Sequence, residues 1–147
     1  IGNAQIKSLA LHKLCGLPTI SDDTGLFVEA LNGKPGVKSA RFASENSDDK
    51  LNRELLLDLM NGKENRNAYF ETAIHYISEE TENSFIGRCE GNICLEERGK
   101  NGFGYDPIFI PYGFEKTFAE LPSEIKNTIS HRYKALIKFA EWLKENN

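Results

Sequence analysis

Apolar residues recur at the spacing of a helical face in several segments of the chain. Residues 3–15 carry such a repeat, and Gly16 follows them as a C-terminal cap. Residues 48–60 carry a second stripe made of leucines, and a short helix is expected in residues 122–129. A final amphipathic helix is marked by Tyr133, Leu136, Ile137, Ala140 and Leu143.

Other segments have the patterns of β-strands. Residues 68–77 are apolar on both faces, which predicts a central strand, and residues 85–95 alternate, which predicts a half-buried strand. Shorter strands are expected at residues 19–21 and 108–110, and an apolar run occupies residues 26–31. This order of helices and strands predicts an α/β fold with a mixed, twisted sheet flanked by helices.

Length, charge and cysteine content argue against several classes of protein, among them nucleic-acid binders and membrane proteins. The length of 147 residues fits a single domain spanning residues 1–147. The formal net charge of −4 argues against a sequence-independent nucleic-acid binder, which needs a broadly basic surface. The chain has no run of about 18 apolar residues and no recognisable signal peptide. Cys15, Cys89 and Cys94 lack metal-site spacing and favour a reducing compartment. We therefore expect a cytoplasmic protein with neither a nucleic acid nor a membrane as its partner.

The first candidate for chemistry is the sequence Asp22-Asp23-Thr24-Gly25, which follows the short strand expected at residues 19–21. Two carboxylates that project together from a turn at a strand end can hold magnesium, or orient and deprotonate a water molecule. The alternative is a polar turn in which an Asp side chain accepts hydrogen bonds from nearby backbone. Two adjacent acids do not decide between these interpretations.

A second candidate is the glycine and aromatic loop of residues 102–107. Its glycines allow backbone amides to approach a ligand, and Phe103 or Tyr105 can stack on a base. Asp106 precedes a proline and is expected in an extended conformation that fixes the direction of its carboxylate. The alternative is a glycine-rich turn whose aromatic side chains pack into the core.

Basic residues cluster where the last two helices are expected to meet. A tight corner there can direct Lys126, His131 and Arg132 towards one point, where Arg offers a planar fork for carbonyl or phosphate oxygens. Ser130 is expected to serve mainly as the N-cap of the last helix. The alternative is that the two cations are solvated helix charges and that the histidine is structural.

Taken together, these segments resemble the inosine triphosphate pyrophosphatase family. The resemblance rests on separated motifs that occur in the family's order and spacing and that cover essentially the whole chain. They are an acidic segment (residues 21–26 and 30–43), the glycine and aromatic loop (residues 102–109) and a C-terminal signature (residues 116–121, 126–127 and 130–132).

The resemblance implies an enzyme that hydrolyses inosine, xanthosine and related purine triphosphates to the monophosphate and pyrophosphate. It also implies magnesium as the cofactor and a homodimer as the assembly. By resemblance, Asp23 is the metal ligand and the base for the attacking water, and Asp22 stands beside it. Thr24 replaces the more usual Ser and should keep its hydroxyl contact. The residues implied to hold the base are Phe103, Gly104, Tyr105, Asp106, Lys126, His131 and Arg132.

The sequence departs from the family at its beginning. Family members start with a strand and a Thr/Ser-x-Asn-x-x-Lys loop that grips the triphosphate, and this pattern is not found ahead of Ile1. Gly2 stands where a further acidic residue is usual. The fold is therefore expected to be N-terminally shortened, either because the chain is a piece of a longer protein or because it is a shortened homologue. For a shortened homologue, the alternative function is a non-catalytic purine-nucleotide-binding or dimeric interaction module.

Overall fold

The computed structural model describes residues 1–146. Helices and strands occur in the mixed order expected from the sequence, and short 3-10 helices join some of them. In chain order they are α1 (Gly2–Cys15), β1 (Thr19–Val28), η1 (Glu29–Leu31), β2 (Lys34–Gly36), η2 (Ser39–Arg41), α2 (Asp49–Met60), β3 (Asn67–Ile77), β4 (Glu82–Ile93), η3 (Asp106–Ile108), β5 (Phe109–Pro111), α3 (Ser123–Ile129) and α4 (His131–Glu145).

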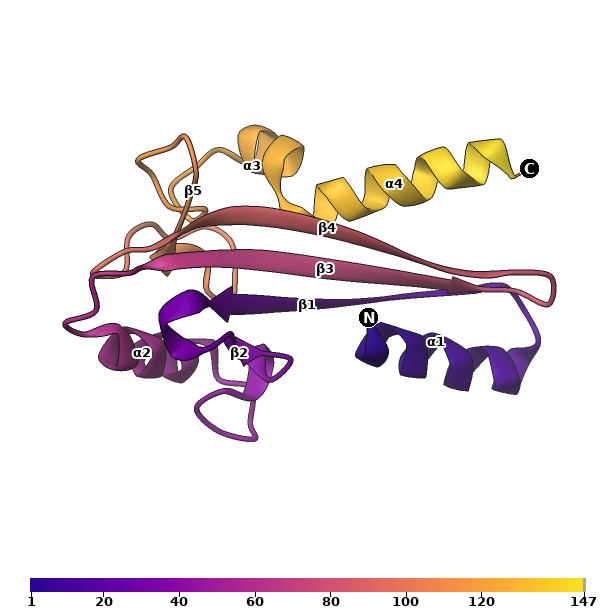
Figure 1. The fold of residues 1–147 in the computed structure, drawn as a ribbon, viewed down its shortest axis with the longest axis horizontal. Helices are drawn as coiled ribbons and strands as arrows, with labels where there is room; N and C mark the ends of the chain where they lie inside the picture. Colours follow the sequence, from indigo (N-terminus) through magenta and orange to yellow (C-terminus); the bar gives the residue numbers. More distant parts are fainter. Residues whose placement is uncertain (147) are drawn as a thin grey trace.

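The strands form one sheet in the order β2-β1-β3-β4-β5, so β3 is central as its apolar pattern predicts. Three long strands, β1, β3 and β4, run the length of the molecule (Figure 1). All pairings between the described strands are antiparallel, whereas a mixed sheet was expected. For β3 and β4 the reason is local, because the hairpin that joins them allows only antiparallel pairing.

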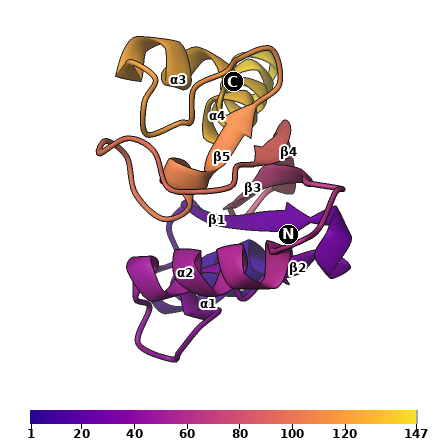
Figure 2. The same ribbon diagram turned by 90° about the vertical axis from the view of Figure 1, so that its left-hand side faces the viewer.

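Helices cover the sheet on both sides. In Figures 1 and 2, α3 and α4 lie above the long strands, and α1 and α2 lie below them. The main core gathers around Leu26, Phe70 and Leu56, where β1, β3 and α2 meet the segment that contains β5. A second cluster lies where Ile74 and Phe85 pack against α4. The α/β architecture with flanking helices is therefore confirmed.

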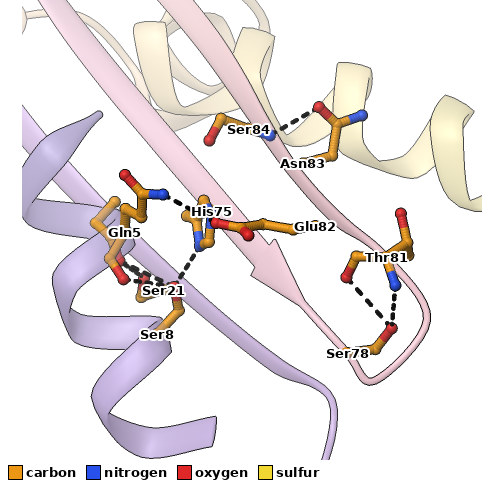
Figure 3. A network of polar contacts seen from close by, with 10 residues as sticks. Gln5, Ser8, Ser21, His75, Ser78, Thr81, Glu82, Asn83 and Ser84 are labelled. Atoms are coloured by element: carbon orange, nitrogen blue, oxygen red, sulfur yellow. Dashed lines mark hydrogen bonds and ion pairs between the residues drawn. The ribbon is translucent and has the colours of Figure 1, made fainter.

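Helix α1 contacts the sheet through polar side chains rather than through a broad apolar stripe. Only Ala4 and Ser8 are buried in it, whereas Leu11 and Leu14 of its helical repeat are exposed. Ser8 Oγ hydrogen-bonds His75 Nδ1, and His75 Nε2 lies 2.8 Å from Glu82 Oε1 (Figure 3). Ser8 and His75 are buried and Glu82 is exposed, and this network fixes α1 near the turn of the β3–β4 hairpin, because buried polar groups are stable only when they are paired.

Within residues 1–146, none of the helices combines the length and the hydrophobicity that a bilayer crossing requires.

Candidate active site

The acidic segment lies within a strand and not in a turn. Strand β1 runs without interruption from Thr19 to Val28, and Asp22 and Asp23 pair with Ile74 and Ala73 of β3. The expectation of a strand-end turn is therefore wrong, as is the picture of two carboxylates that project together. Since successive side chains of a strand point to opposite faces, Asp22 and Asp23 lie on different sides of the sheet.

Asp22 belongs to the face covered by α4. Its carboxylate Oδ2 lies 3.4 Å from Nη2 of Arg132, and the same Nη2 donates to Thr24 Oγ1 at 3.2 Å. Thr24 Oγ1 also lies 2.8 Å from the hydroxyl of Thr72 on β3. Arg132 thus joins the first residues of α4 to alternate positions of β1.

Asp23 belongs to the face covered by α1. Its Oδ1 lies 3.9 Å from Nζ of Lys7, and Lys7 Nζ also donates to the backbone carbonyl of Asp22. Both side chains are partly open to solvent. Lys7 was not singled out from the sequence, because its proximity to β1 depends on how α1 docks.

The glycine and aromatic loop is organised by Asp106. Its Oδ2 accepts the backbone N–H of Phe103 at 3.1 Å and the ammonium of Lys126 at 2.6 Å. Gly102 has a φ of +79°, and a Cβ added there would overlap the Asp106 carboxylate, so only glycine fits this position. Asp106 begins the 3-10 helix η3, so the extended conformation expected for it is wrong. The preference of a residue before proline is overruled here by the hydrogen bonds that close the turn, such as Asp106 N–H to Phe103 O at 3.1 Å.

The loop's aromatic residues take different roles. Tyr105 is 5% exposed, packs in the main core and donates its hydroxyl to Ser39 O at 2.7 Å. Burial raises the pKa of the Tyr105 hydroxyl. Phe103 is 64% exposed, and Lys126 Nζ lies 5.1 Å from its ring centroid. Core packing therefore describes Tyr105, whereas Phe103 offers an accessible aromatic face.

Helices α3 and α4 meet at Ser130, which caps α4 by accepting the N–H of Tyr133 at 3.2 Å, as its sequence position predicts. The cap directs His131 into the protein. His131 is 7% exposed, and its ring stacks on Phe70 with centroids 4.6 Å apart. Burial, reinforced by the nearby Arg132 and Lys126 cations, lowers the pKa of His131 to about 3.

The imidazole of His131 is therefore neutral at physiological pH, and its Nδ1 has no hydrogen-bond partner within residues 1–146. A neutral imidazole has one donor and one acceptor nitrogen. It can thus bind a polar ligand group without adding a charge.

These groups surround one cavity of about 420 Å³. Its lining contains the sequence-derived candidates Thr24, Phe103, Gly104, Tyr105, Asp106, Lys126, His131 and Arg132. Asp22 and Asp23 do not line the cavity, although Asp22 forms an ion pair with Arg132, which does. The lining also includes Ser39, Asp49 and Phe70, which sequence reasoning missed because no local pattern marks them.

Another arrangement, Ser8, His75 and Glu82, contains the residue types of a nucleophilic triad. Ser8 is 0% exposed, so a substrate cannot reach its hydroxyl, and the network is structural. Residues 1–146 hold no cluster of three or more His, Cys, Asp or Glu side chains that could bind a metal ion.

Comparison with known proteins places this geometry in a family. The model of the Ham1 family matches residues 1–142. The chain belongs to the Ham1 family. A curated member, the dITP/XTP pyrophosphatase of Thermoanaerobacter pseudethanolicus, is 50% identical over 143 residues, which are 96% of this chain and 72% of the relative. The dITP/XTP pyrophosphatase of Flavobacterium johnsoniae is 48% identical over 144 residues, which are 97% of this chain and 74% of the relative.

Solved Ham1 structures share the fold. The Ham1 protein of Staphylococcus aureus superposes with a TM-score of 0.96 at 40% identity, over 99% of this chain and 76% of that protein. The HAM1 protein of Coxiella burnetii superposes with a TM-score of 0.93 at 40% identity, over 97% of this chain and 75% of that protein. Pyrophosphatases are hydrolases that act on acid anhydrides, so this Ham1 member belongs to an enzyme family.

Proposed function

We propose that this Ham1 protein is a nucleoside triphosphate pyrophosphohydrolase for deaminated purine triphosphates (ITP, dITP and XTP), yielding the monophosphate and pyrophosphate. The observation that carries the proposal is the single cavity that gathers all eight candidate substrate-binding residues, from Thr24 to Arg132. The names of the curated relatives support the substrate class.

The cavity suits a purine with a carbonyl at position 6. Phe103 supplies an exposed ring for stacking, while His131 and Arg132 supply hydrogen-bond donors. A 6-keto purine presents an acceptor to such donors, whereas adenine presents an amino donor. With adenine, the buried N–H of His131 lacks an acceptor, which costs about 1–3 kcal/mol and separates the two classes of base.

We further propose that the phosphates pass the edge of β1, which β2 pairs only from Leu26 to Val28, and reach the face that carries Asp23. Asp23 accepts a proton from the water whose oxygen bonds to the α-phosphorus, while the bond from that phosphorus to the bridging oxygen of pyrophosphate breaks. Lys7, whose Nζ lies 3.9 Å from Asp23 Oδ1, offers a cation to the phosphate oxygens. Asp22 is instead paired with Arg132 at the cavity rim.

Magnesium is the proposed cofactor of this metal-dependent family. Mg²⁺ is usually held by one or two carboxylates together with substrate phosphates, so the single partly exposed carboxylate of Asp23 fits a metal that arrives with the nucleotide. When bound, the ion would offset charge on the triphosphate.

Release of pyrophosphate from ITP, XTP and ATP with Mg²⁺ tests the proposal. We expect release from ITP and XTP, much less from ATP, and none above background for Asp23→Ala. Equal rates with ATP, or an undiminished rate for Asp23→Ala, would contradict it.

The second candidate function is purine-nucleotide binding without turnover. It is favoured by the division of the site, because many residues form the base cavity, whereas on the proposed phosphate side residues 1–146 place only Lys7 beside the Asp23 carboxylate. Calorimetry that shows binding of inosine monophosphate, together with no pyrophosphate release, would establish this function instead. A homodimer is proposed for either function and is tested by light scattering.

A further inference from the structure

Helix α2 holds the glycine and aromatic loop through the side chains of Asp49, which also lines the cavity, and Arg53. Asp49 Oδ2 accepts the backbone N–H of Gly104 at 3.1 Å, and Arg53 Nη1 donates to the carbonyl oxygen of Gly104 at 2.8 Å. Asp49 and Arg53 are four residues apart, so both side chains leave the same face of α2. Together they bind the peptide groups on both sides of the Gly104 Cα.

This clamp acts where the loop has little packing of its own. Gly104 has a φ of +60°, and a Cβ built there would meet no atom within 4 Å. Its neighbour Phe103 is largely exposed. Polar contacts, and not packing around Gly104, therefore hold this part of the loop.

Arg53 is itself fixed. Its Nε donates to Glu97 Oε1 at 2.8 Å, and its side chain is 16% exposed. A guanidinium held at one nitrogen presents its other donors in a defined direction, because the group is planar. Arg53 thus connects α2, the segment after β4 and the loop.

The same helix also holds a second segment that lines the cavity. Asn52 is buried, accepts the N–H of Ala43 at 2.8 Å and donates to the carbonyl of Ala40 at 2.9 Å. Ala40 lines the cavity, as do Gly104 and Asp49. One turn of α2 therefore contacts two cavity-lining segments that lie far apart in the sequence.

We propose that Asp49 and Arg53 are positioning residues, which hold Gly104 so that Phe103 and its neighbours face the purine base before it arrives. The inference rests on the proposed function, since it assigns the cavity to a base. Without the clamp, the loop must be ordered at the moment of binding, which weakens affinity. Contacts to the base act equally before and during phosphate cleavage, so their loss raises KM and leaves kcat nearly unchanged.

The experiment compares Arg53→Ala, Asp49→Ala and Asp49→Asn with a matched control, Arg66→Ala. Asn keeps an acceptor oxygen for the Gly104 N–H. Arg66 also binds backbone carbonyls, including those of Met60 and Cys94, but it does not line the cavity. The measurements are the Kd for inosine monophosphate, KM and kcat for ITP, amide exchange at Gly104 and the unfolding temperature.

We expect Arg53→Ala and Asp49→Ala to raise Kd and KM about tenfold, with kcat within about twofold of the unaltered protein. Asp49→Asn should restore most of the affinity, and Gly104 amide exchange should accelerate in Asp49→Ala. Arg66→Ala should lower the unfolding temperature while Kd stays unchanged.

The outcomes separate this inference from the proposed function. If the unaltered protein binds and hydrolyses ITP while Kd and KM are unchanged in both alanine variants, only the positioning role is overturned. An increase of Kd in Arg66→Ala equal to that in Arg53→Ala would also overturn it, because general destabilisation would explain both. If the unaltered protein binds no purine nucleotide, the proposed function fails and this inference fails with it.

Discussion

Asp22 and Asp23 are adjacent in the chain, yet Asp22 pairs with Arg132 of α4, whereas Asp23 lies beside Lys7 of α1. The sheet stands between the two side chains. Each carboxylate therefore acts in a different environment, and the pair cannot bind one ion between them.

This separation predicts different effects of neutralising each acid. Asp23→Asn should lower kcat for ITP at least about a hundredfold, the usual range for loss of a general base, and leave the Kd for inosine monophosphate unchanged. Asp22→Asn should lower kcat/KM by less than about tenfold, because it removes only an exposed ion pair. Steady-state kinetics measures kcat and KM of the two variants, and calorimetry measures their Kd for inosine monophosphate. Equal losses of kcat would show that the carboxylates act together.

The low pKa of His131 predicts a pH-dependent stability. The folded protein keeps His131 neutral down to about pH 3, whereas the unfolded chain takes up this proton near pH 6.5. Between these values the unfolded state binds more protons, so stability falls as pH falls, by up to about 1.4 kcal/mol per unit. Above pH 7 the group is neutral in both states and contributes no slope.

Urea unfolding at pH 7 and pH 5 tests this prediction. His131→Gln should lose less stability between the two pH values than the unaltered protein loses. The same loss in both proteins would contradict a buried, neutral His131.

The ion pair of Lys126 and Asp106 predicts a strong effect of removing one partner. Lys126→Met leaves the Asp106 carboxylate, which is 6% exposed, without its cation. Breaking a buried pair in this way typically costs about 3 kcal/mol, and the loop that Asp106 organises should loosen. Lys100→Met, at an exposed position, is the control and should change stability little. Thermal unfolding and the Kd for inosine monophosphate are the measurements, and a change no larger than that of Lys100→Met would contradict the prediction.

Close contact between α4 and β4 predicts that Gly87 does not tolerate a side chain. A Cβ at Gly87 would overlap the carbonyl oxygen of His131 and the backbone nitrogen of Ala135. Gly87→Ala should therefore shift α4, lower stability by about 2 kcal/mol and weaken nucleotide binding by moving His131. A Cβ added at Gly2 meets no atom within 4 Å, so Gly2→Ala should lower neither the stability nor the affinity for nucleotide. Comparable unfolding temperatures of the two variants would contradict this packing argument.

Local features of the structure could be predicted from the sequence because they depend on nearby residues. The helix α2 and the N-cap at Ser130 are confirmed. The leucine stripe expected in α2 is only partly correct, because Leu51 and Leu59 are exposed and the buried face is formed by Asn52, Leu56 and Met60. The observed bounds of α2 (Asp49–Met60) and α3 (Ser123–Ile129) differ from the expected bounds by no more than one residue. Strand β4 differs more, since it runs from Glu82 to Ile93 whereas a strand was expected at residues 85–95. The hairpin turn before it is closed by the N–H of Ser78, which donates to Thr81 O at 2.8 Å.

Features that depend on distant partners could not be predicted. Asp22-Asp23-Thr24-Gly25 has the composition of a turn, but β3 pairs with β1 from Thr19 to Val28 and keeps the segment extended. The clamp of Gly104 by Arg53 joins residues 51 positions apart. No pattern in either segment indicates the other.

By itself, the sequence determined most of the helices and strands, the family resemblance and eight of the residues that line the cavity, since each depends on residue type and order along the chain. Only the tertiary structure decided that Asp22 and Asp23 face opposite sides of the sheet, that His131 is buried and neutral, and that α2 holds the loop. The physical reason is that strand pairing, burial and long-range hydrogen bonds arise between segments brought together by folding, and they override the preferences of each segment alone.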